Sequence, residues 1–307
     1  MLALSEHQQA AFVGIRSTFY RISMLFGQGV LVYIAGVIEL RTNDIPMSWR
    51  VALLTAAIVF AALTLWHLFF IPKVEQSASP SVSPMTTKDV LHSLGRSVTT
   101  FFSHRGVALS IVFMLLYRLP EAFLVKMCTP FLVASPSAGG LGLSTEMVGI
   151  IYGTVGAIAL TLGGILGGLF SAKVGLKRAL WPMAVMITLP DLVYVYLSYA
   201  LSSSLLVVNV CVFIEQFGYG FGFTAYMLYL IYYSQGEFKT SHYALCTAFM
   251  ALSMMIPGLF AGALQEAVGY RTFFVIVVAF CSITYLVTAF LKIDPEFGKK
   301  QPEEQVK

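Results

Sequence analysis

The sequence predicts an all-α fold, a polytopic bundle of helices that cross a lipid bilayer. Of its 307 residues, 58% are hydrophobic and only 11% are charged, whereas a soluble domain typically carries about 25% charged residues. Apolar segments of about 20 residues or more recur along the chain, and this length crosses a hydrocarbon core of about 30 Å. Because backbone polar groups in lipid must be paired within the spanning element, we expect these segments to be helices.

Eight segments are long and apolar enough to span the membrane. In chain order they cover residues 10–38, 49–71, 107–133, 148–170, 178–199, 205–233, 243–263 and 272–291. Trp49, Trp66 and Trp181 lie near the ends of these segments, where aromatic side chains are enriched at the membrane interface. Their positions support the proposed boundaries.

The lysine and arginine residues of the connecting loops predict the orientation of the chain. Twelve lie on one side and three, Arg41, Arg50 and Arg271, on the other. The twelve are Lys73, Lys88, Arg96, Arg105, Lys173, Lys177, Arg178, Lys239, Lys292, Lys299, Lys300 and Lys307. Since cytoplasmic loops carry the excess of positive charge, we expect both termini in the cytoplasm.

One long hydrophilic connection divides the spans into two and six. We therefore expect residues 1–72 to hold the last two helices of an N-terminal half and residues 106–292 a six-helix C-terminal half, with a cytoplasmic tail at 293–307. Residues 73–105 form a cytoplasmic linker whose first part is rich in serine and proline. Its second part, from Thr87, has apolar residues at helical spacing and predicts an amphipathic helix on the membrane surface; an undocked loop is the alternative.

Glycine recurs through the span at 148–170. Three GxxxG pairs fall at 149/153, 163/167 and 164/168, and small residues at this spacing let neighbouring helices approach closely. The surface could pack statically or slide during a conformational change. A nucleotide-binding loop is not indicated, because no strand precedes these glycines.

A short basic turn follows this glycine-rich span. Its residues Gly168, Lys173, Gly175, Lys177 and Arg178 resemble the intracellular signature G-x-x-x-D-R/K-x-G-x-R/K of the major facilitator superfamily. Ala172 stands where the signature has aspartate, so a plain positively charged loop is the alternative to a conformational switch. The resemblance implies a major facilitator fold.

A narrower resemblance covers most of the chain. The segments Tyr20-Arg-Ile-Ser23, Leu116-Tyr-Arg-Leu-Pro-Glu-Ala-Phe123, Thr129-Pro-Phe-Leu132, residues 213–225 and residues 244–252 are similar to those of AmpG-type muropeptide permeases. That group is itself similar to acetyl-coenzyme A transporters. The resemblance implies a proton-driven importer of anionic cell-wall fragments in the bacterial cytoplasmic (inner) membrane.

In that family the Tyr20-Arg21 segment belongs to the fifth of twelve helices. The resemblance therefore implies a partial twelve-helix fold in which eight helices are present and the first four are lacking. A truncated reading frame, a split gene and a natural eight-span carrier are all open interpretations. A separate N-terminal half is accordingly a possible partner.

Charged residues lie deep inside three of the predicted spans, although each costs about 2.5 to 3.5 kcal/mol at the bilayer centre. Arg21 and Arg118 lie about 16 Å into their spans at the helical rise of 1.5 Å per residue, and Glu215 lies at a similar depth. Glu121 is an i, i+3 neighbour of Arg118 and can pair with it, whereas Lys126 points elsewhere. We expect these five residues to form a polar centre between the two halves of a carrier.

The centre carries one surplus positive charge, which suits an anionic solute gripped by arginine forks. Permanent ion pairs that lock the bundle, Arg118 with Glu121 and Arg21 with Glu215, are the alternative. Because the histidines lie in loops or near span ends, Glu121 or Glu215 is the candidate for carrying a coupling proton. Asp191, which follows a proline, we interpret as a helix-break or vestibule residue.

Three classes of function remain. A proton-coupled carrier of an anionic solute, with muropeptides, acetyl-coenzyme A and other organic anions as possible cargo, agrees with the charges. A membrane-embedded enzyme would need a nucleophile with a base, yet the chain has no HxxxxD, GxSxG or metal-spaced histidine motif. An inactive carrier fragment is the third class. We expect lipid, solute and protons as partners, and no cofactor, metal or nucleic acid.

Overall fold

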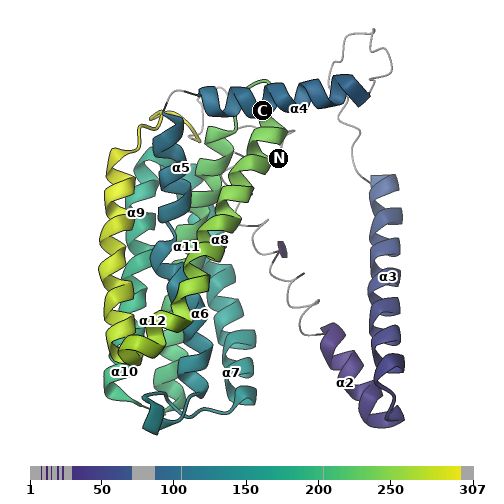
Figure 1. Ribbon diagram of the computed structural model, residues 1–307, viewed down its shortest axis with the longest axis vertical. Helices are drawn as coiled ribbons and strands as arrows, with labels where there is room; N and C mark the ends of the chain where they lie inside the picture. Colours follow the sequence, from purple (N-terminus) through teal and green to yellow (C-terminus); the bar gives the residue numbers. More distant parts are fainter. Residues whose placement is uncertain are drawn as a thin grey trace. The chain divides into compact units, whose positions relative to one another are not determined.

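The computed structural model describes residues 8, 12, 15, 19, 20, 23, 30–70, 87–104, 106–202 and 204–298. These residues are helical apart from short connections, and they include no strand (Figure 1). Helices α2 and α3 belong to one compact unit and helices α4 to α12 to another. The all-α prediction is confirmed for the described part of the chain.

The smaller unit is a helical hairpin of α2 (Leu31–Thr42) and α3 (Ile45–Phe70). Asn43 adopts a left-handed conformation with φ of 52° and donates its N–H to the carbonyl of Glu39, which ends α2. Asp44 then accepts a hydrogen bond from the N–H of Met47 at 3.0 Å and caps α3. This cap explains why α3 begins four residues before the expected span at 49–71. The expected span at 10–38 lies mainly outside the described residues.

The larger unit contains the remaining spans. Its helices are α4 (Thr87–Ser103), α5 (Val107–Leu116), α6 (Leu119–Val133), α7 (Thr145–Ile151), α8 (Ala157–Val174), α9 (Leu176–Thr188), α10 (Leu192–Ala200), α11 (Leu205–Tyr233) and α12 (Lys239–Phe290). A π-helical turn η3 (Tyr152–Gly156) joins α7 to α8, and a 3-10 turn η4 (Leu189–Asp191) joins α9 to α10.

Seven of the eight expected spans are seen as helices. Within the described ranges, six helical segments are long and apolar enough to cross a membrane, and the 52-residue α12 holds two expected spans. The backbone of α12 is broken at Gly269, where φ is 73° and only glycine is unstrained. The two spans expected at 243–263 and 272–291 lie on either side of this break.

The glycine-rich helix α8 packs backbone to backbone on α11. A Cβ at Gly163 would clash with the carbonyl oxygen of Phe217, and a Cβ at Gly220 would clash with that of Leu160. Gly222 approaches the backbone of α9 in the same way. Helices α8, α9 and α11 therefore form a closely packed block, as small residues allow.

The glycine pairs do not all serve this contact. Gly167 lies against α11, whereas a Cβ added at Gly149 or Gly153 would meet no described atom within 4 Å. Close approach along the predicted face is therefore seen for the pair at 163/167 and not for the pair at 149/153.

Helix α4 crosses the end of the six-helix bundle (Figure 1). Ser97 and Phe101 are buried against the bundle, and the carbonyl of Ser97 lies 3.1 Å from Nε2 of His242 in α12. Leu94, which is 52% exposed, and the side chain of Phe102 remain outside this contact. The helix is therefore docked, and the alternative of an undocked loop is wrong for residues 87–103.

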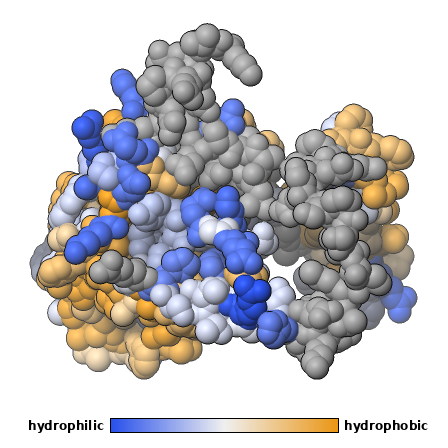
Figure 2. All heavy atoms as spheres, turned by 90° about the horizontal axis from the view of Figure 1, so that it is seen from above, coloured by the Kyte–Doolittle hydropathy of each residue, from blue (hydrophilic) through white to orange (hydrophobic). Residues whose placement is uncertain are grey.

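Viewed from the α4 end, the six-helix unit carries its hydrophilic side chains over this end and its hydrophobic side chains on the flanks (Figure 2). The segment after α12 also packs here. Ile293 and Phe297 are buried, and the carbonyl of Phe297 accepts a hydrogen bond of 3.1 Å from the N–H of Leu176 at the start of α9. Packing against the bundle thus continues beyond residue 292.

Candidate functional site

A helix break forms the centre of the candidate site. The span expected to run unbroken over 107–133 is interrupted between α5 and α6, where Arg118 has φ of −102° and ψ of 14°. Pro120 explains the break, because proline has no N–H to donate to the carbonyl of Leu116 and its ring crowds that turn. The expectation of one continuous helix is wrong at this point.

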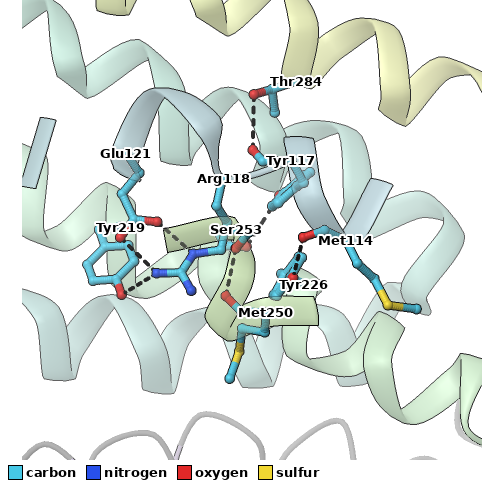
Figure 3. Close-up of polar contacts among 10 residues, drawn as sticks. Met114, Tyr117, Arg118, Glu121, Tyr219, Tyr226, Met250, Ser253 and Thr284 are labelled. Carbon is cyan, nitrogen blue, oxygen red and sulfur yellow. Dashed lines mark hydrogen bonds and ion pairs between the residues drawn. The ribbon is translucent and has the colours of Figure 1, made fainter. Parts of the chain in front are cut away.

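Side chains from two other helices satisfy carbonyl groups at the break (Figure 3). The hydroxyl of Tyr226 in α11 donates to the carbonyl of Met114 at 2.6 Å. The hydroxyl of Thr284 in α12 donates to the carbonyl of Tyr117 at 3.0 Å. Since an unpaired carbonyl in the membrane interior is costly, these bonds stabilise the irregular backbone.

The break places Arg118 and Glu121 in a buried ion pair. Arg118 Nε donates to Glu121 Oε2 at 2.7 Å, and Arg118 Nη2 donates to Glu121 Oε1 at 2.9 Å. The same Nη2 donates to the hydroxyl of Tyr219 at 2.9 Å (Figure 3). The i, i+3 pairing expected from the sequence is therefore seen, with Tyr219 of α11 as an additional partner.

Aromatic rings surround the guanidinium group of Arg118. Its Cζ lies 4.5 Å from the centroid of the Phe223 ring, 5.6 Å from that of Tyr219 and 5.8 Å from that of Tyr226. Such faces attract a cation more strongly once water is excluded, and Arg118 is only 5% exposed. A carboxylate of a solute could use this fork only after Glu121 has left it.

Glu215 lies in a different set of contacts. It is 2% exposed on α11, and Nε2 of Gln216 donates to its Oε1 at 3.1 Å and to its Oε2 at 2.9 Å. Arg118 reaches α11 through Tyr219, one helical turn beyond Glu215, rather than through a hydrogen bond to Glu215 itself. Glu215 is therefore buried, and no hydrogen bond between the described residues links it directly to Arg118 or Glu121.

One other predicted residue, Lys126, is not part of this cluster. Lys126 is exposed, and its Cε lies 2.9 Å from the position that a Cβ at Gly258 would occupy. Its aliphatic stem thus uses the space that Gly258 leaves on α12. Arg21 lies outside the described residues.

The predicted conformational loop is the turn between α8 and α9. Gly175 has φ of 80° and ψ of 159°, a backbone region that essentially only glycine adopts. Gly168 is buried on α8, whereas Lys173, Lys177 and Arg178 are exposed and make no ion pair with an acidic residue among those described.

Sequence reasoning missed the aromatic partners of Arg118. Tyr219, Phe223 and Tyr226 share one face of α11, and their i, i+4, i+7 spacing was the available signal. Asp191 ends the 3-10 turn η4, which agrees with its interpretation as a helix-break residue, and its side chain is 2% exposed.

The spans and the buried polar residues define a multi-pass membrane protein. The model of the Major Facilitator Superfamily matches residues 2–237 and 138–307. The chain therefore belongs to the major facilitator superfamily, and the fold type expected from the basic turn is confirmed.

Curated relatives support the narrower resemblance. The chain is 25% identical over 276 residues to the anhydromuropeptide permease of Escherichia coli (strain K12), an alignment of 90% of this chain and 52% of that protein. It is 23% identical over 262 residues to a putative transporter AmpG 1 of Rickettsia bellii, covering 85% of this chain and 60% of the relative. An uncharacterized protein of Haemophilus influenzae is 24% identical, covering 88% and 61%. The chain spans about half to three fifths of the length of these relatives.

Proposed function

We propose that the protein acts in secondary active transport, as a proton-coupled importer of an anionic solute such as an anhydromuropeptide across the bacterial inner membrane. The family and the names of the relatives support transport of a small solute without chemical change. The observation that carries the proposal is the buried Arg118–Glu121 pair at a broken helix. Discontinuous helices near the membrane midplane form the substrate and ion sites of many secondary transporters.

The pair suggests how a solute and a proton could be exchanged. A neutral Glu121 no longer attracts the guanidinium, so a carboxylate of the solute takes its place in the Arg118 fork. Tyr219 retains its hydrogen bond and keeps the guanidinium oriented. When the solute leaves, Glu121 loses its proton and closes the pair again.

We assign supporting roles to the other predicted residues. Lys126 offers an exposed positive charge for a solute with several carboxylates, and Glu215 is a second candidate for proton binding. Arg21 would contribute from the N-terminal half. The α8–α9 turn would mediate conformational change from the cytoplasmic side, where both termini would lie.

Two further candidates belong to this proposal. Acetyl-coenzyme A or another organic anion would present carboxylate or phosphate groups to the same arginine. An inactive carrier fragment is the other, because alternating access requires two halves to move against each other. This candidate is considered because the aligned part of the chain covers only 52% of the Escherichia coli permease.

Uptake of labelled anhydromuropeptide into inverted and right-side-out membrane vesicles tests the proposal. We expect accumulation that a protonophore abolishes and that unlabelled muropeptide, rather than acetyl-coenzyme A or simple sugars, inhibits. Arg118→Lys keeps the charge but loses the fork, so we expect affinity to fall about tenfold to a hundredfold, as for loss of one charged hydrogen bond. Glu266→Gln, which changes an exposed acid of α12, is the matched control.

Three outcomes would count against parts of this proposal. Normal proton-driven accumulation in Glu121→Gln removes Glu121 from coupling. Unchanged affinity in Arg118→Lys removes Arg118 from the binding site. Uptake that appears only when the first four helices of a relative are co-expressed identifies the chain as one part of a carrier.

A further inference from the structure

A second helix break places another acid inside the bundle. The 3-10 turn η4 ends at Asp191, and the N–H of Leu192 bonds back to the carbonyl of Leu189. The carbonyl of Thr188 is thereby released from the helical ladder and lies 3.7 Å from Sγ of Cys281 in α12. The span over α9 and α10 thus has irregular backbone at the point where Asp191 stands.

One oxygen of the buried Asp191 carboxylate lacks a hydrogen-bond donor among the described residues. Asp191 is 2% exposed, and its Oδ2 accepts no hydrogen bond from any residue in the described part of the chain. Within the described part of the chain, the charged groups that act on it electrostatically are Glu215 and Glu121, and both are acids. Arg118 does not offset this arrangement, because both oxygens of Glu121 already occupy its fork.

Helices α6, α9, α10, α11 and α12 all pack against η4. Among the described residues, the titratable groups that interact with Asp191 are Glu121 and Cys128 of α6, Glu215 of α11 and Cys281 of α12. The cations of α6 are directed elsewhere, because Arg118 pairs with Glu121 and Lys126 is exposed. The basic residues of α9, Lys177 and Arg178, lie exposed at its other end.

A charged carboxylate in such surroundings is unfavourable, because it loses hydration and is repelled by Glu215 and Glu121. A proton on Oδ2 removes both costs. The Oδ2 atom of Asp191 holds no described element in place through a hydrogen bond.

We propose that Asp191 is a proton-binding site that holds the coupling proton while Glu121 is paired with Arg118. The proton leaves Oδ2 when the bundle rearranges and passes to Glu121, directly or through Glu215. Neutral Glu121 then frees Arg118 for the anionic solute, and a proton from the opposite side of the membrane restores the acid at Asp191. This inference rests on the proposed transport function and names a carboxyl group that it did not include.

Infrared difference spectroscopy of the purified protein in lipid vesicles tests the site without requiring transport. We expect the wild-type chain at neutral pH to show the C=O stretching band of a protonated carboxylic acid. The band should be absent from Asp191→Asn, shifted in Asp191→Glu, and retained in Glu215→Gln and in the control Glu266→Gln. Absence of the band from wild type, or its persistence in a folded Asp191→Asn, overturns the proposal.

Transport measurements separate this inference from the function on which it rests. We expect the Asp191→Asn variant to exchange labelled for unlabelled anhydromuropeptide as the wild type does. Its proton-driven accumulation should be at least tenfold lower than that of the wild type. Accumulation equal to wild type would refute the coupling role of Asp191 even if the infrared band behaves as expected. If the wild-type chain transports no muropeptide and yet loses the band in Asp191→Asn, the proton site stands and the proposed cargo fails.

Discussion

Replacing Glu121 with glutamine would leave the Arg118 guanidinium charged and buried beside a neutral amide. The carboxylate now accepts two hydrogen bonds of 2.7 and 2.9 Å, and both residues are at most 5% exposed. The amide can accept only one of these bonds and turns an NH2 group toward the other donor. Breaking one side of a buried pair costs about 3–5 kcal/mol, so we expect this loss in the free energy of unfolding.

This loss is measured by unfolding the protein in mixed micelles with an increasing fraction of denaturing detergent. The variant Glu266→Gln, which changes an exposed residue, is the control. The double variant Arg118→Met with Glu121→Leu leaves no buried charge, and we expect it to lie within about 1 kcal/mol of the parent, because apolar replacement of a buried pair is often neutral. A loss below about 1 kcal/mol in Glu121→Gln would refute the reasoning, since the pair would then behave like an exposed one.

Three further substitutions test the helix contacts by the same unfolding measurement. Gly163→Val should lower the free energy of unfolding by about 1–3 kcal/mol, because it forces α8 away from the Phe217 carbonyl. Gly149→Ala places its methyl group in open space and should be neutral or slightly stabilising. Equal effects of the two substitutions would argue against the close contact. Gly175→Ala should cost about 1–3 kcal/mol because of the positive φ, and a neutral result would contradict this backbone conformation. Thr284→Val should cost about 1 kcal/mol by leaving the carbonyl at the α5–α6 break unpaired, and an unchanged stability would show that this bond contributes nothing.

The lengths of the helices could be predicted because the membrane sets them and polar residues mark their ends. Helix α11 covers the same residues, 205–233, that its apolar run predicts, with Ser204 before it and Ser234 after it. The span at 107–133 shows the limit of this reasoning. Its apolar run continues across Pro120, so hydropathy alone cannot reveal that the helix stops at Arg118. The proline was the visible signal, but proline is tolerated in many membrane helices.

The partners of the buried charges were harder to predict than the charges themselves. Arg118 and Glu121 are close in sequence, so their pairing follows from helical geometry. Tyr219 is 101 residues from Arg118, and only the packing of α11 against the α5–α6 break brings it near. The burial of Asp191 was hard to predict for a similar reason. Depth along a helix does not say which way a side chain faces, and its burial depends on the helices packed around η4.

The contact between α8, α9 and α11 limits which parts of the six-helix unit can move. At these contacts a backbone carbonyl lies where a glycine has no side chain. If one helix slid along another by one residue, a larger side chain would meet the same carbonyl. We therefore expect α8, α9 and α11 to move together as one rigid body. Helix interruptions remain at Arg118, Asp191 and Gly269 and at the π-helical turn η3, and those at Arg118 and Asp191 carry the ionisable groups assigned above. A proton or a solute charge that binds at Arg118–Glu121 or at Asp191 would then act directly on a point where the backbone can bend.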